Sequence, residues 1–120
     1  MLKKNMYEGL VWFSLSGEVG LTDVAGFLRE MSKEITNGNK IFVLDISDGE
    51  HIRRHSFDAL INIKEKLRKS GVRLIIVCCK KILIDILNVE RVTEHFEVVS
   101  DSSLVKNQFS FSQNCFSYRN

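Results

Sequence analysis

Residues 41–60 read IFVLDISDGEHIRRHSFDAL, and this stretch decides the fold that the sequence predicts. Its first part, residues 41–46, is a continuous apolar run with one aspartate near its end, typical of a strand covered on both faces. A strongly polar segment follows at residues 47–58. From Phe57 to Lys69, apolar residues then recur at helical spacing. The stretch therefore predicts a buried strand, a charged loop and an amphipathic helix.

The segments on either side repeat this alternation of strand and helix. Further strands are predicted over residues 2–6, 10–16, 72–79 and 96–99. Further helices are predicted from the N-cap residue Thr22 to Ile35, over residues 80–89 and, briefly, over residues 101–105. Strands that alternate with helices imply an α/β fold with a largely parallel sheet built by right-handed crossovers. Because only three helices are substantial, we expect them to cover one face of the sheet less completely. A partner or the C-terminal tail could complete that cover.

The composition is that of one globular domain. The chain has 120 residues, of which 44% are hydrophobic and 27% charged, and its formal net charge is +2. No segment approaches the roughly 20 unbroken apolar residues of a membrane span. The apolar stretch near the N-terminus is interrupted by Glu8 and has no cleavage pattern, so we expect no signal peptide and a cytoplasmic location.

The cysteines and histidines do not predict a disulfide framework or a metal site. Cys78 and Cys79 are adjacent at the end of an apolar run, which favours two small packing residues, and Cys115 lies far away in the tail. His51 and His55 are four residues apart, but they lie in the predicted loop with two arginines between them, which would oppose a cation. We therefore expect no bound metal.

Other enzyme and nucleic-acid signatures are also missing. Residues 17–20, Gly-Glu-Val-Gly, lack the third glycine and the Lys-Ser/Thr of phosphate-binding loops. His55-Ser56-Phe57-Asp58 contains the residue types of a catalytic triad, but sequence neighbours rarely converge into one. Basic residues are scattered and interleaved with carboxylates, so a nucleic-acid surface is disfavoured. The sequence favours a protein with no enzymatic activity and no cofactor.

Ser56 has two interpretations. A serine directly before Phe57-Asp58-Ala59 is a natural N-cap for the second helix. Alternatively, a phosphate on Ser56 would meet the free N–H groups of that helix and the guanidinium groups of Arg53 and Arg54.

The C-terminal segment, residues 107–120, differs from the predicted domain of residues 1–106. Its last part, FSFSQNCFSYRN, alternates Phe109-Ser110-Phe111-Ser112 and ends with Phe116 and Tyr118 nearby. Alternation with a period of two predicts an extended segment with one apolar face. We expect this tail to pack on its own domain or on a second copy of the chain.

Four segments in this order and spacing resemble a known family: LSGEVGLTDVAGFLREM, IFVLDIS, KSGVRLIIVCC and NVERVTEHFEVVSD. The chain resembles a STAS domain, the module of sulfate transporters and anti-sigma-factor antagonists, from about Leu10 to Lys106. The resemblance implies a mixed, mostly parallel sheet of four to five strands with helices mainly on one face. It also implies that the partner is a serine-kinase anti-sigma factor, whose phosphorylation of the antagonist breaks the association.

The family's phosphoacceptor loop commonly reads Asp-Ser-Ser-Gly-Leu, about ten residues after a Leu-Asp-Leu-Ser strand end. Leu44-Asp45-Ile46-Ser47 matches that strand end, which aligns the loop motif with residues 53–57. Arg53 then takes the place of the acidic residue, His55 that of the acceptor serine and Ser56 that of the glycine. The resemblance thus predicts a phosphorylation switch that is altered or lost, with Ser56 as the possible substitute acceptor.

These observations lead to a main hypothesis and two alternatives. The main one is a protein-binding module whose partner contacts the 47–58 loop and the following helix, through Arg53, Arg54, His55, Ser56 and Asp58, with Gly17 in a neighbouring turn. One alternative is a STAS-like scaffold subunit that assembles through the tail. The other is the binding of a small anion or nucleotide at the start of the second helix.

Overall fold

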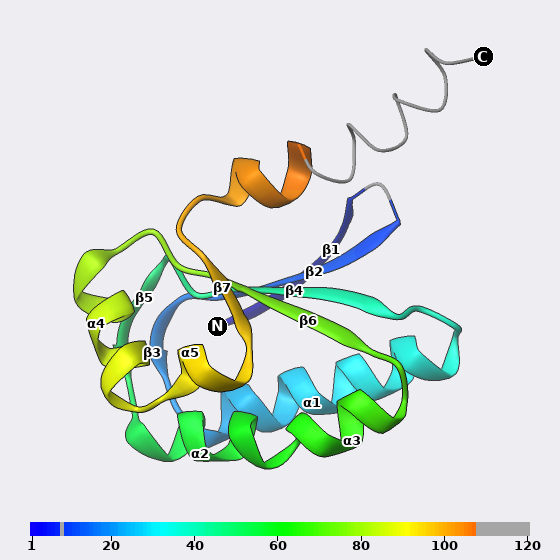
Figure 1. Ribbon diagram of the computed structural model, residues 1–120, viewed down its shortest axis with the longest axis horizontal. Coiled ribbons are helices and arrows are strands. Elements are labelled where there is room, and N and C mark those ends of the chain that lie inside the picture. The colour runs from blue at the N-terminus through cyan, green and yellow to red at the C-terminus, as the bar shows by residue number, and fades with distance from the viewer. Residues whose placement is uncertain (8, 108–120) are drawn as a thin grey trace.

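The computed structural model describes residues 1–7 and 9–107, and its centre is a five-stranded sheet (Figure 1). The strands lie in the order β1, β2, β4, β6, β7. Their bounds are Leu2–Tyr7, Leu10–Leu15, Ile41–Asp45, Arg73–Val77 and Glu97–Val99. β1 is antiparallel to β2, and every other neighbouring pair is parallel. The predicted mixed, mostly parallel α/β sheet is confirmed.

A second, two-stranded sheet lies beside the end of the main one. It pairs β3, Gly17–Val19, with β5, Gly49–Ile52, in parallel. The sequence predicted a turn at the first segment and a loop at the second. Both strands are too short for a period-two pattern to distinguish them from irregular chain.

The helices are α1 (Leu21–Thr36), α2 (Arg54–Asn62), α3 (Lys64–Lys69), α4 (Lys81–Val89) and α5 (Val92–His95). In Figure 1, α1, α2 and α3 lie below the main sheet, whereas residues 102–107, also helical, lie above it. The helices are thus mainly on one face, as predicted.

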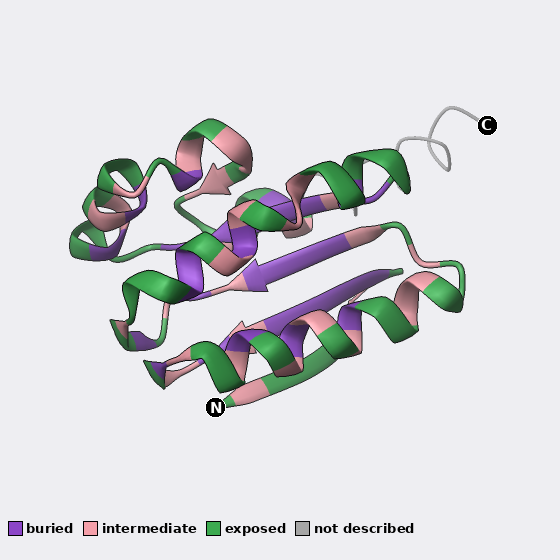
Figure 2. Cartoon of the chain, turned by 90° about the horizontal axis from the view of Figure 1, so that it is seen from below, coloured by how far each residue is buried: buried purple, intermediate pink, exposed green. Residues whose placement is uncertain are grey.

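Side chains alternate between the two faces of the sheet. On β4, Phe42 and Leu44 join the larger core between the sheet and the helices, while Val43 joins a smaller cluster on the opposite face. That smaller cluster also contains Trp12 and Val105, so residues 102–107 cover part of the second face. Figure 2 shows the central strands mainly buried and the outer sides of the helices in front of them largely exposed.

Two predicted helix starts are wrong. The N-cap of α1 is Gly20 and not Thr22, and the Asp23 carboxylate accepts the Gly20 N–H at 3.1 Å. The N-cap of α2 is Arg53 and not Ser56, which lies inside the first turn. Both helices start earlier than predicted because a short strand ends directly before each of them. β3 leads into α1, and β5 leads into α2.

The predicted helix over residues 57–69 is in fact two helices that meet at Ile63. The Ile63 N–H donates to the Leu60 carbonyl at 3.2 Å, a bond between residues three apart that tightens the chain locally. Neither proline nor glycine lies there, so the sequence contained no breaker signal.

The side chains of the two adjacent cysteines differ in burial. Cys78 is fully buried, whereas Cys79 is exposed, so the prediction of two packing residues holds only for Cys78. Both thiols are free. Cys115 and the aromatic residues of the tail lie outside the described residues.

Within the described part of the chain, none of the helices has the length and apolar character needed to cross a membrane.

Candidate functional site

The candidate site lies where β4 ends and the chain turns into β5 and α2. The Asp45 carboxylate accepts the Ser47 N–H at 2.9 Å and holds the first residues of the turn. The Gly49 N–H then donates to the Ile46 carbonyl at 2.9 Å. A Cβ at position 49 would lie 3.1 Å from that carbonyl oxygen, so the turn favours glycine there.

Gly17 is brought beside this turn, as predicted from the convergence of turns at one edge of the sheet. Its N–H donates to the Asp48 carbonyl at 3.1 Å, and it pairs with Gly49 in the two-stranded sheet. Its φ of 69° is in the left-handed region that favours glycine. These contacts hold the backbone of the two turns together.

Both arginines of the site are exposed and paired with carboxylates. The Arg53 guanidinium is 2.7 Å from Glu18, and the Arg54 guanidinium is 3.3 Å from Glu90. Arg53 and Glu18 are each about 60% exposed, at 61% and 59%. Because both of its members are exposed, the Arg53–Glu18 pair contributes little to stability, and a partner can compete for that guanidinium group at small cost.

The start of α2 has an unfavourable distribution of charge. Its N-cap and first residue are Arg53 and Arg54, the exposed His55 follows, and its first turn contains no acidic residue. A helix N-terminus carries partial positive charge and its first N–H groups lack partners within the helix. This end of the molecule therefore favours an anionic group supplied from outside.

Ser56 is the predicted site residue whose position differs most from expectation. Its side chain is 1% exposed, and its hydroxyl has no hydrogen-bond partner among the described residues. It faces a small apolar hollow next to Phe57, Leu60 and Val24. In this conformation the hydroxyl is inaccessible both to a kinase and to a partner.

The other predicted site residues remain at the surface. His55 and Asp58 are exposed on α2, beside the two arginines. His51 lies on β5, opposite Glu18 in the two-stranded sheet. No cluster of three potential metal ligands occurs among residues 1–7 and 9–107.

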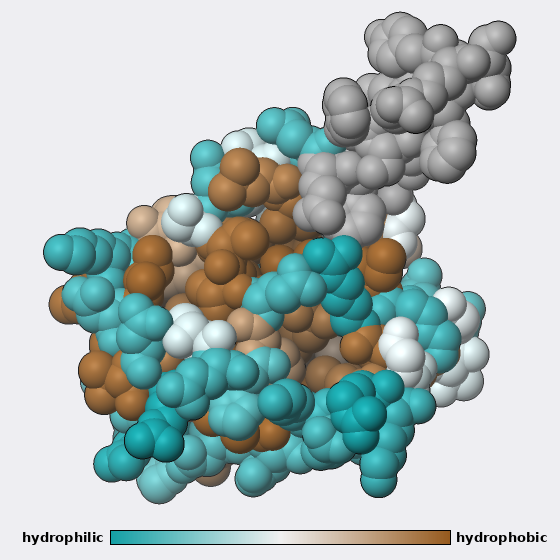
Figure 3. All heavy atoms as spheres, in the orientation of Figure 1, coloured by the Kyte–Doolittle hydropathy of each residue, from teal (hydrophilic) through white to brown (hydrophobic). Residues whose placement is uncertain are grey.

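Helix α4 adds an apolar region that sequence reasoning missed. Ile82 and Val89 are 70% and 78% exposed, and the ion pair between Arg54 and Glu90 places the C-terminal end of α4 beside α2. Figure 3 shows hydrophobic side chains exposed at this end of the molecule, on the left. The available signal was the sequence KILIDILNV, in which six of the nine residues are apolar, more than one buried stripe needs.

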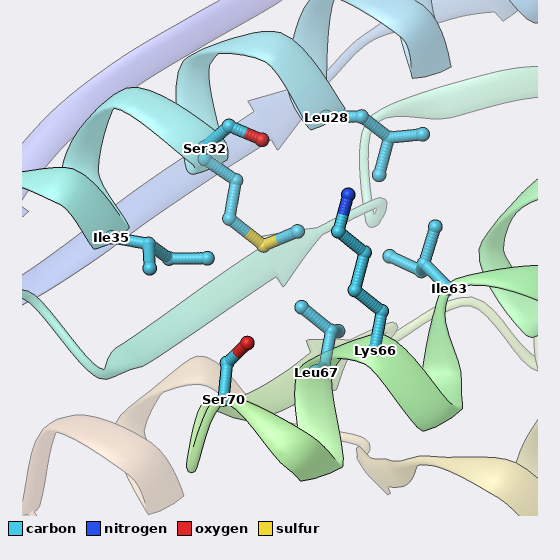
Figure 4. Close-up of a pocket in the computed structure, with 8 residues that line it drawn as sticks. Leu28, Ser32, Ile35, Ile63, Lys66, Leu67 and Ser70 are labelled. Carbon is cyan, nitrogen blue, oxygen red and sulfur yellow. The ribbon is translucent and has the colours of Figure 1, made fainter.

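A separate groove lies at the other end of the helical layer, between α1 and α3 (Figure 4). Its volume is about 250 Å³, and it shares no residue with the charged site.

Comparison with known proteins supports one family. The family model described as the STAS domain matches residues 2–104. No curated protein matches the chain.

Several solved structures share the fold. The protein TM1081 of Thermotoga maritima has a TM-score of 0.76 at 17% identity, with 92% of this chain and 89% of that chain covered. An anti-sigma factor antagonist from Mycobacterium paratuberculosis has a TM-score of 0.71 at 16% identity, with 86% and 87% covered. The Bacillus anti-sigma factor antagonist SpoIIAA, unphosphorylated, has a TM-score of 0.66 at 11% identity, with 86% and 91% covered. At these identities the likeness is one of fold.

Proposed function

Because this chain belongs to the STAS domain family, we propose that it is a non-enzymatic, protein-binding regulatory module of the anti-sigma-factor-antagonist type. Its partner docks on the surface formed by residues 47–58 and the outer side of α2. The structural likeness to SpoIIAA and to the mycobacterial antagonist supports this class of function.

The observation that carries the proposal is the group of exposed basic side chains at the start of α2, whose first turn contains no acidic residue. Arg53, Arg54 and His55 are all exposed there, next to N–H groups that lack helical partners. An acidic partner surface would satisfy both the side chains and the helix dipole. We propose a serine-kinase anti-sigma factor as that partner, with the exposed apolar side of α4 as the adjoining contact.

The phosphorylation switch of the family is lost in this proposal. The position aligned with the usual acceptor is His55, which has no hydroxyl. Ser56, the substitute, turns its hydroxyl into the core and would have to leave it before a kinase could reach it. Binding is therefore constitutive or controlled in another way.

Capture from a lysate of the host organism tests the binding surface. The wild-type chain should retain a kinase-type partner that the charge-reversed Arg53→Glu/Arg54→Glu variant loses. The matched control is Lys3→Glu/Arg29→Glu, which makes the same change in net charge on β1 and α1. Equal retention by all three proteins would rule out the surface.

Incubation with the host's anti-sigma kinases and ATP tests the switch. Mass spectrometry of the intact chain and of its peptides should find no phosphate on Ser56. A stoichiometric phosphate there would show that the switch survives one residue away from its usual place.

A scaffold role is the second candidate, and the exposed Ile82 and Val89 of α4 favour it. In that case copies of the chain assemble without a kinase partner. Sedimentation of the full chain and of a chain ending at residue 107, each with and without Ile82→Lys/Val89→Lys, would show whether α4 or the tail drives assembly. A monomer in every case would exclude this candidate.

A further inference from the structure

The groove between α1 and α3 lies beside Ile63, the residue at which α2 ends and α3 begins. α1 packs against α2 but approaches α3 less closely. This leaves space between α3 and the C-terminal half of α1. The lining residues are Leu28, Met31, Ser32 and Ile35 of α1, together with Ile63, Lys66, Leu67 and Ser70. The walls are thus mostly aliphatic, and hydroxyl groups occur on both sides.

Lys66 is the one charged side chain in this lining. Figure 4 shows it extending from α3 across the groove toward α1. Among the described residues its amine has no hydrogen bond and no ion pair, unlike its neighbour Arg68, which is 2.9 Å from Glu65. A cation without a counter-charge at an aliphatic groove matches a ligand that is anionic at one end and aliphatic along its length.

Two other hollows formed by the described residues lack this combination. In the hollow beside β7, Lys64 is already 3.3 Å from the His95 ring, and Arg73 is paired with Glu97. In the hollow on the second face, the amine of Lys106 lies 5.2 Å from the ring centres of Tyr7 and Trp12. In each of these, the cations already have partners within the chain.

We propose that the groove between α1 and α3 binds an aliphatic carboxylate of medium chain length. The aliphatic part lies between Leu28, Ile35 and Ile63, and the carboxylate accepts hydrogen bonds from the Lys66 amine. The volume of about 250 Å³ lies just below the range of roughly 300–1,000 Å³ that holds drug-sized ligands, so a medium chain fits better than a long one. This site is independent of the partner surface at the start of α2.

Methyl NMR of the full chain with ¹³C-labelled methionine tests the proposal directly. The chain has three methionines, of which Met31 lines this groove and Met6 lines the hollow on the second face. Octanoate should shift the Met31 methyl signal saturably and leave the Met6 signal in place. Affinity should rise about fourfold for each added methylene from hexanoate to octanoate, because each one buries more apolar surface.

Substitution of the lysine separates the carboxylate contact from non-specific apolar binding. Lys66→Gln should weaken octanoate binding about five- to tenfold, whereas Lys69→Gln, on the same helix but outside the lining, should have no effect. Both lysines are exposed, so neither change endangers folding. Octylamine, with the opposite charge, should bind much more weakly than octanoate.

Several results would overturn the proposal. These are an unmoved Met31 signal at millimolar octanoate, a shift of Met6 instead, equal binding by Lys66→Gln, or equal binding of octylamine. A Met31 shift produced by an acidic amphipathic peptide and not by octanoate would also overturn it, in favour of a protein ligand.

Discussion

His55 occupies the second position of α2, where a negative side chain is favourable and a neutral or positive one is not. His55→Glu should therefore raise the free energy of unfolding by about 0.5 kcal/mol and, at the same time, weaken partner binding. Urea denaturation and a binding titration measure the two effects. Asn62→Glu, at the other end of the same helix, should lower stability instead. If His55→Glu lowered both stability and binding, the loss of binding would reflect damage to the fold.

Ser56 presents a buried hydroxyl without a partner, which costs free energy in the folded state. Ser56→Ala should raise the free energy of unfolding by about 1 kcal/mol, because it removes that cost and suits a helix better. Ser56→Asp should instead destabilise the chain by several kcal/mol, since it buries a charge. Urea denaturation distinguishes these outcomes. An aspartate tolerated without loss of stability would show that position 56 reaches solvent readily.

The short edge strand β7 is held to β6 partly by an ion pair. The Arg73 guanidinium of β6 donates two hydrogen bonds to the Glu97 carboxylate, at 2.7 and 2.8 Å. These bonds lower the pKa of Glu97 below its usual value in the folded state. Stability from this pair is thus present above the unfolded pKa and is lost as pH falls through the folded pKa.

Glu97→Gln tests that pH dependence. At pH 7 the variant should be slightly less stable than the wild type, because Arg73 and Glu97 are 39% and 50% exposed and solvent screens them. The difference should shrink toward zero as the pH falls below the folded pKa of Glu97. Urea denaturation of both proteins over a pH series measures it. A difference that grew on acidification would contradict the assignment.

The elements that could be predicted from the sequence are those whose pattern is local. β4 and β6 are continuous apolar runs, and α1 and α4 have apolar residues at helical spacing. The pairing of β3 with β5 was not predictable, because it depends on contacts between residues more than thirty positions apart. The break at Ile63 was missed for the same reason, since tertiary packing overrides a helical pattern without a breaker residue.

On the scale of the whole molecule, the helical layer presents two different surfaces. The charged start of α2 lies toward one end, and the aliphatic groove between α1 and α3 lies toward the other (Figure 1). The sequence predicted the first surface, because Arg53, Arg54 and His55 follow a buried strand and remain exposed. It did not predict the burial of Ser56, which depends on where α2 begins, or the groove, which depends on how two helices diverge.

An acidic partner of the kinase type is proposed to dock on the start of α2. Isothermal titration of this chain into the purified anti-sigma kinase of the same host tests this docking. We predict that Arg53→Glu/Arg54→Glu weakens binding at least about tenfold, that Lys3→Glu/Arg29→Glu leaves it unchanged, and that added salt weakens wild-type binding. Wild-type affinity in the Arg53→Glu/Arg54→Glu variant would show that the partner does not dock there.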